Sequence, residues 1–231
     1  MDCDIILLMR TRTLYAVLAL FGLFQCNAQT PEPTEVAPGI TLPTGGVGTV
    51  YVLDTAASGP VLLHIEPHEV VNTSHAMTNF LRAQVFSGPH STIEVDGPHA
   101  PTVLASTKAV FFVRLSGEDA EIMRSWVHLL WLQSNKKRRE LSDLSTNVFG
   151  GQRTRDVDEV PCDTEMIEGT NWLKITPKDP LLPGEFAIAF LPKSVNEYPV
   201  EVYDFGVAGG KPSASNPYAP KAPANSDTTK P

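Results

Sequence analysis

The sequence predicts a mainly β fold, either an antiparallel β-sandwich or a partly open barrel, with at most one or two short helices. The first observation is that about ten short apolar runs are separated by Pro- and Gly-containing turns. The second is the order of runs near the C-terminus, at residues 172–176, 185–191 and 200–205. Because turn signals separate these three runs, we interpret them as a β-meander.

The middle run of the three, residues 185–191, is apolar on both of its faces. Phe186 and Ile188 point to one side of an extended chain, and Ala187 and Ala189 point to the other. A strand of this kind is covered on both sides, so we place it in the core.

The first 28 residues have the pattern of an export signal. Arg10 and Arg12 precede an uncharged run at residues 14–24, and small residues at 26 and 28 predict cleavage after Ala28. The run is shorter than the ~20 residues that span a bilayer. The protein is therefore expected to be exported, periplasmic or secreted. A lipid anchor through Cys26 is the alternative, although Gln25 stands where such signals need a small residue.

Composition divides the rest of the chain into three parts. Residues 29–46 are rich in Pro, Thr and Gly and are expected to form a flexible linker. Residues 208–231 have little apolar surface to bury and are expected to be a disordered tail. A single β-rich domain then occupies residues 47–207.

Strand signals recur at short spacing within this domain. Residues 49–54 and 61–66 flank a turn and predict a hairpin. Further strands are expected at residues 81–86, 92–95 and 109–115, an edge strand at 160–167, and a loop at 147–158. Residues 70–79 fit a short helix or an irregular loop.

Residues 118–144 contain no Pro or Gly, so one long helix fits them. However, apolar residues alternate over 126–132, and a polar stretch at 134–137 resembles a hairpin tip. We favour a long β-hairpin because the surrounding sequence is β-rich. The basic run at residues 136–139 is then a charged tip that discourages edge pairing.

Composition excludes some functions and leaves one cysteine to consider. The formal charge of −8 argues against a nucleic-acid surface. Cys162 is the only cysteine after the predicted signal, so it has no internal disulfide partner, and we interpret it as a packing residue at a strand edge.

One stretch offers a candidate metal site. In an extended chain His64, Glu66 and His68 point to the same side, and imidazole and carboxylate groups suit zinc. His75 could complete the site. The alternative is a solvent-facing strand end that carries surface histidines, because Pro67 interrupts the strand.

Several short motifs resemble those of one protein group. They are Lys174-Ile175-Thr176-Pro177, Leu182-Pro183-Gly184-Glu185-Phe186-Ala187 and Tyr203-Asp204-Phe205-Gly206-Val207. The chain resembles uncharacterised exported bacterial β-rich proteins with a C-terminal Leu-x-Pro-Gly-Glu-Tyr/Phe-Ala motif and a Phe-Gly-Val ending. The resemblance implies a secreted or periplasmic β-sandwich-like domain, and it implies no activity or site residues.

The sequence contains no recognised catalytic motif, so we expect an exported non-enzymatic β-domain that binds an envelope protein or a glycan. One alternative is a metal-dependent hydrolase built on His64, Glu66 and His68. Another is a structural module of an envelope assembly.

Overall fold

The computed structural model describes residues 34–56, 58–74, 90–117, 119–146, 153–209 and 216–219. This part is mostly β and includes one short helix, α3 (Ala120–Arg124), which confirms the predicted fold class. The strands in chain order are β1 (Thr34–Ala37), β2 (Ile40–Leu42), β3 (Val50–Asp54), β4 (Val61–Ile65), β5 (Pro67–Ser74), β6 (His90–Asp96), β7 (Val103–Leu104), β8 (Ala109–Arg114), β9 (Val127–Ser134), β10 (Arg138–Thr146), β11 (Arg153–Val157), β12 (Cys162–Met166), β13 (Trp172–Pro177), β14 (Gly184–Phe190) and β15 (Glu201–Val207).

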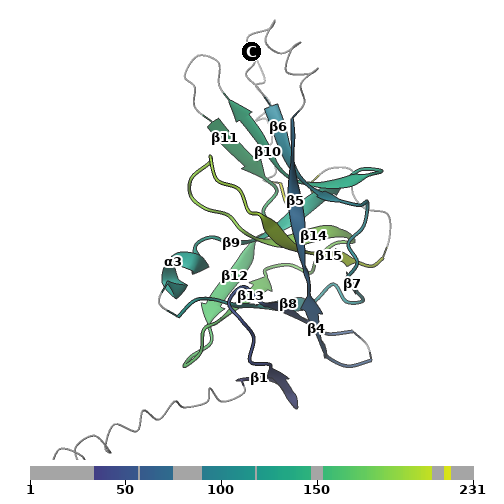
Figure 1. The fold of residues 1–231 in the computed structure, drawn as a ribbon. Helices are drawn as coiled ribbons and strands as arrows, with labels where there is room; N and C mark the ends of the chain where they lie inside the picture. The colour runs from purple at the N-terminus through teal and green to yellow at the C-terminus, as the bar shows by residue number, and fades with distance from the viewer. Residues whose placement is uncertain are drawn as a thin grey trace, which may run out of the picture. The chain divides into compact units, whose positions relative to one another are not determined.

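Six antiparallel strands close into a barrel. Their order is β10, β6, β5, β15, β14 and β9, and the pairing of β9 with β10 completes the circle (Figure 1). Outside this circle, β11 pairs with β10, and β7 runs parallel to β15. Closure leaves few free strand edges in this part of the fold.

A second sheet has the strand order β12, β13, β8, β3 and β4. β3 and β4 form the hairpin expected from the sequence, and β12 lies at an edge, as predicted for residues 160–167. The chain passes from this sheet to the barrel at Glu66, between the end of β4 and the start of β5. The sheet and the barrel are therefore joined by continuous backbone.

β14 separates two apolar cores. Phe186 and Ile188 face the core between the barrel and the second sheet, together with Phe111 and Phe205. The small residues on the other face of β14 belong to the core inside the barrel, whose apolar members are Ile93, Val95, Leu130, Leu132, Leu141, Leu144, Ala187, Ala189, Leu191 and Val202. The prediction that this strand is covered on both faces is confirmed.

The predicted meander of β13, β14 and β15 is wrong. β14 does pair with β15, but β13 pairs with β8 and β12 in the other sheet. The turn that contains Pro183 and Gly184 carries the chain from one sheet to the other. A turn signal marks a change of direction, and it does not determine which strands become neighbours.

The hairpin predicted within residues 118–144 is confirmed, with β9 and β10 as its strands. They pair directly only near the tip, where Arg139 is opposite Ser134 and Glu140 is opposite Gln133. Farther from the tip β10 pairs with β11 instead, so a strand occupies much of the region expected to be a loop. β5 likewise extends through Ser74, where a helix or loop was expected.

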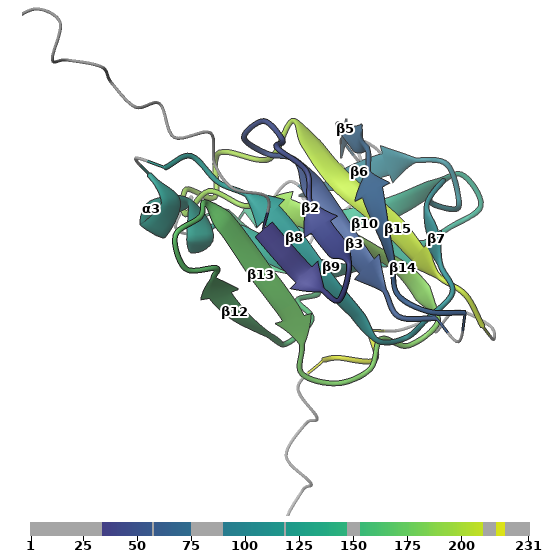
Figure 2. The same ribbon diagram turned by 90° about the horizontal axis from the view of Figure 1, so that it is seen from below.

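A hairpin of β1 and β2 lies within the region expected to be a flexible linker. It packs on the outer face of the second sheet, where Leu42 is buried with Phe112 and Trp172 (Figure 2). Gly39 occupies the turn with φ of 74°, a conformation that favours glycine. Apolar side chains at residues 36, 40 and 42 pack in this cluster. The Pro- and Thr-rich composition of the region led us to predict a linker instead.

Some sequence predictions lie outside the described residues. They are the export signal at 1–28, the strand at 81–86, His75, and most of the tail at 208–231. Four tail residues, Asn216–Ala219, are described, and they contact the domain through Asn216 and Tyr218. Among the described residues, no helix has the length and apolar character needed to cross a membrane.

Candidate functional site

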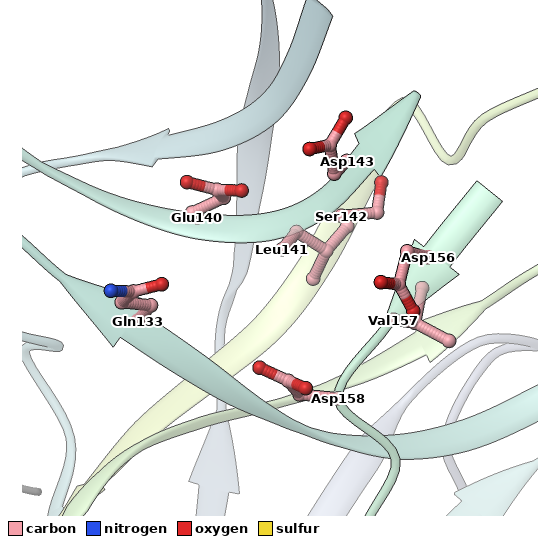
Figure 3. A pocket seen from close by; sticks show the side chains of 8 residues that line it. All are labelled: Gln133, Glu140, Leu141, Ser142, Asp143, Asp156, Val157 and Asp158. Atoms are coloured by element: carbon pink, nitrogen blue, oxygen red, sulfur yellow. The ribbon is translucent and has the colours of Figure 1, made fainter. Parts of the chain in front are cut away.

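A cavity lies where β9 and β11 separate along the same edge of β10. β9 pairs with the start of β10, and β11 pairs with β10 from Ser142 onward. We call this place the acidic fork. Its cavity has a volume of about 230 Å³ and is lined by Gln133, Glu140, Leu141, Ser142, Asp143, Asp156, Val157 and Asp158 (Figure 3).

Four carboxylates line the acidic fork and give it a negative potential. Glu140 and Asp143 come from β10, whereas Asp156 and Asp158 come from β11 and the residue after it. Asp143 Oδ1 lies 2.5 Å from Nδ1 of His90. Such a concentration of like charge in a partly enclosed space attracts a cation.

The environment of Asp158 shifts the pKa of its carboxyl group. Burial raises its pKa above the ordinary range, a hydrogen bond from Asn216 opposes this shift, and the charge of Asp156 adds to it. A positive group in the cavity would stabilise the ionised form of Asp158. The environment of this carboxylate is therefore suited to a cationic ligand.

Ser142 also lines the acidic fork. The residue is only 3% exposed, and its hydroxyl adds a neutral polar group to the acidic lining.

The chemistry of the lining favours an ammonium or guanidinium group. Within the described part of the chain, no three His, Cys, Asp or Glu side chains are arranged to hold a metal ion. The described residues that line the cavity include no aromatic side chain on which a sugar ring could stack. The end of a lysine or arginine side chain matches both the charge and the volume of the cavity.

A second polar cluster occupies one mouth of the barrel. Arg139 points inward from the start of β10 and is 1% exposed. Its Nη2 atom lies 2.7 Å from Oδ2 of Asp204 and 3.2 Å from the carbonyl oxygen of Asp96, and its Nη1 atom lies 3.8 Å from Oε2 of Glu185. Since Asp204 is completely buried, this is an interior ion pair.

Two histidines border the barrel-mouth cluster and connect it to the surface. Nδ1 of His68 contacts Asp204, and Nδ1 of His99 lies 3.0 Å from Oε1 of Glu185. The backbone N–H of Ala100 donates to Oε2 of Glu185 over 2.8 Å. Both carboxylates thus have partners within the fold, so we interpret the cluster as part of the barrel structure.

The candidate metal ligands are divided between two environments. Nδ1 of His64 lies 2.9 Å from Glu66, and the His64 ring lies against Tyr51 with centroids 5.1 Å apart. His68 instead contacts Asp204 at the barrel mouth. The structure thus pairs His64 with Glu66, whereas the ring of His68 contacts Asp204.

Cys162 lies at the start of the edge strand β12 and packs against the larger core. Burial, together with the nearby charges of Glu159 and Asp163, raises the pKa of its thiol to about 12. Because the thiolate is the reactive form, we expect the native protein at pH 8 to react with Ellman's reagent at least ~100-fold more slowly than the protein unfolded in guanidinium. A similar rate in the two states would contradict this environment.

Sequence reasoning missed the acidic fork. Its carboxylates lie in a predicted hairpin and a predicted loop, about fifteen positions apart along the chain. The acidic content of residues 140–143 and 156–159 was the only local signal, and nothing local indicated that the two segments pair.

The chain was also compared with known proteins. No family model, curated protein or solved structure matches it.

Proposed function

We propose that the chain is an exported, non-enzymatic binding domain that recognises a basic segment of an envelope protein. In this proposal a lysine or arginine side chain of the partner enters the acidic fork. The observation that carries it is that four carboxylates line one cavity. Export rests on the N-terminal sequence pattern alone.

Paired strands carry most of the lining of the acidic fork. Three strands carry its lining, and β10 is anchored by pairing with β6, β9 and β11. Strand pairing orders the backbone of such a site before a ligand binds, which lowers the entropic cost of binding. The chain contributes binding groups here, and we assign no reaction to them.

Calorimetric titration with an acetylated and amidated hexalysine peptide tests the proposal. The test variant is Asp156→Asn/Asp158→Asn, and the matched control is Asp163→Asn/Glu165→Gln on the exposed face of β12. Both double variants remove the same charge from the protein. We expect the test variant to lose about tenfold in affinity at low salt, and the control to stay within about twofold of the unaltered protein.

Three outcomes would overturn the proposal. Equal losses in the two double variants would show that hexalysine responds only to net charge. If hexalysine shows no measurable binding to the unaltered protein at 20 mM salt, the proposal that the partner is basic fails. Binding of a neutral N-acetylglucosamine oligomer at the fork, without binding of hexalysine, would identify a glycan as the ligand instead.

A further inference from the structure

An apolar groove lies beside α3, away from the acidic fork. It has a volume of about 250 Å³ and shares no lining residue with the fork. Three separate segments supply its apolar side chains, namely α3, the end of β14, and β15 with the loop before it: Met123, Phe190, Pro199, Val200 and Tyr203. The described residues that line the groove include no Lys or Arg.

The floor of the groove is held by the core between the barrel and the second sheet. Tyr203 is a buried member of this core, and Met123 and Phe190 are partly buried against it. The rings of Phe190 and Tyr203 meet edge-on, with their centroids 6.4 Å apart. Because core packing positions these side chains, the groove exists without a ligand, as most binding pockets do.

Exposed apolar side chains gather around this groove. Val200 lines it and is 77% exposed, the highest value among the large apolar residues described. Val47 precedes the lining residue Gly48 and is 62% exposed, and Ile122 precedes Met123 and is 56% exposed. Single exposed apolar residues are ordinary, whereas a group of them beside an apolar hollow is typical of an interaction surface.

The rim of the groove is acidic. Glu201 lines the groove, and Glu69 is directly opposite it where β15 pairs with β5. Both glutamates are exposed, and like charges at opposite positions of two strands weaken the pairing. Glu121, next to Ile122 on α3, adds a third exposed carboxylate. A cationic group at the rim would relieve the repulsion between Glu69 and Glu201.

We propose that the groove binds a protein segment in which an apolar side chain stands next to a lysine or arginine. The apolar side chain enters the groove beside Phe190 and Val200, and the cation pairs with Glu201 and Glu69 at the rim. A second copy of this chain would bring two acidic rims together, so charge disfavours it as the occupant. The inference goes beyond the proposed function and does not depend on the acidic fork.

Calorimetric titration with the peptide acetyl-Lys-Leu-Lys-Phe-Lys-Leu-Lys-amide tests the apolar contact. The test variant is Val47→Ser/Val200→Ser, and the matched control is Val61→Ser/Val103→Ser, which removes two exposed valines elsewhere. We expect the test variant to lose about tenfold in affinity and the control to stay within about twofold of the unaltered protein. All four valines are exposed, so both variants should fold.

A second pair of variants tests the acidic rim with the same peptide. Glu69→Gln/Glu201→Gln should weaken binding about threefold to tenfold at low salt. Glu165→Gln/Glu168→Gln removes the same charge from exposed positions elsewhere and should change the affinity less than twofold. The charge-reversed peptide acetyl-Glu-Leu-Glu-Phe-Glu-Leu-Glu-amide should bind at least about tenfold more weakly than the basic one.

Three outcomes would overturn the inference. Equal affinities of the two double-valine variants for the basic peptide would show that the groove does not bind it. Equal affinities of the unaltered protein for the two peptides would remove the role of the acidic rim. Self-association of the unaltered protein in sedimentation, lost in Val47→Ser/Val200→Ser, would identify a second copy as the occupant. Binding of the apolar-basic peptide without binding of hexalysine would support the groove and reject the acidic fork.

Discussion

Arg139→Met is expected to lower the free energy of unfolding by about 3–5 kcal/mol, because it leaves buried carboxylates without their cation. Asp204 is fully buried and Glu185 is nearly so, and Arg139 is the charged partner that both share. Methionine fills a similar volume, so the loss arises from electrostatics more than from a cavity. Chemical denaturation of the unaltered and variant proteins at pH 7 measures the difference.

Lys137→Met is the matched control for this prediction, since Lys137 is an exposed cation in the same basic run. It should change stability by less than about 0.5 kcal/mol. Adding Asp204→Leu to Arg139→Met removes one of the buried carboxylates that lack their cation. The double variant should therefore recover part of the lost stability. Equal stability of Arg139→Met and the unaltered protein would show that the barrel-mouth ion pair is not structurally important.

Phe205→Ala is expected to destabilise the protein by about 3–5 kcal/mol through loss of packing at the centre of the larger core. The Phe205 ring is fully buried and is stacked on Phe186, with centroids 5.5 Å apart. It also lies 4.9 Å from the Phe111 ring, which belongs to the second sheet. Removing the ring therefore weakens the contact between the barrel and that sheet.

The control for Phe205→Ala is Val103→Ala, since Val103 is an exposed apolar residue on β7. Thermal and urea unfolding should give the Phe205 variant a much lower free energy of unfolding than the unaltered protein. The free energy of unfolding of the Val103 variant should stay within about 0.5 kcal/mol of the unaltered protein. A loss under 1 kcal/mol for Phe205→Ala would mean that the two layers do not depend on this aromatic contact.

The sequence predicted the features of the fold that are local. Short apolar runs identified β3, β4, β8 and β14, and alternation of apolar side chains over residues 126–132 favoured a hairpin over a helix for β9 and β10. The two apolar faces of residues 185–191 also predicted that β14 is covered on both sides. These properties depend on neighbours in the chain, which the sequence displays directly.

The features that depend on distant pairing were missed. Arg139 belongs to a basic run that resembles an exposed tip, yet closure of the barrel turns its side chain inward toward Asp204. The acidic fork likewise exists only because β9 and β11 share one edge of β10. Which strands share an edge is set by long-range packing, and no local pattern records it.

The acidic fork is the place where we propose that a basic group binds. The most direct measurement is a ¹⁵N–¹H correlation spectrum of the labelled protein, recorded during titration with the hexalysine peptide. We predict that the largest shifts fall on Gln133 and on residues 140–143 and 156–158, with Asn216 among them. Shifts centred on other acidic surfaces, such as β12, or the absence of any localised shift, would contradict the account.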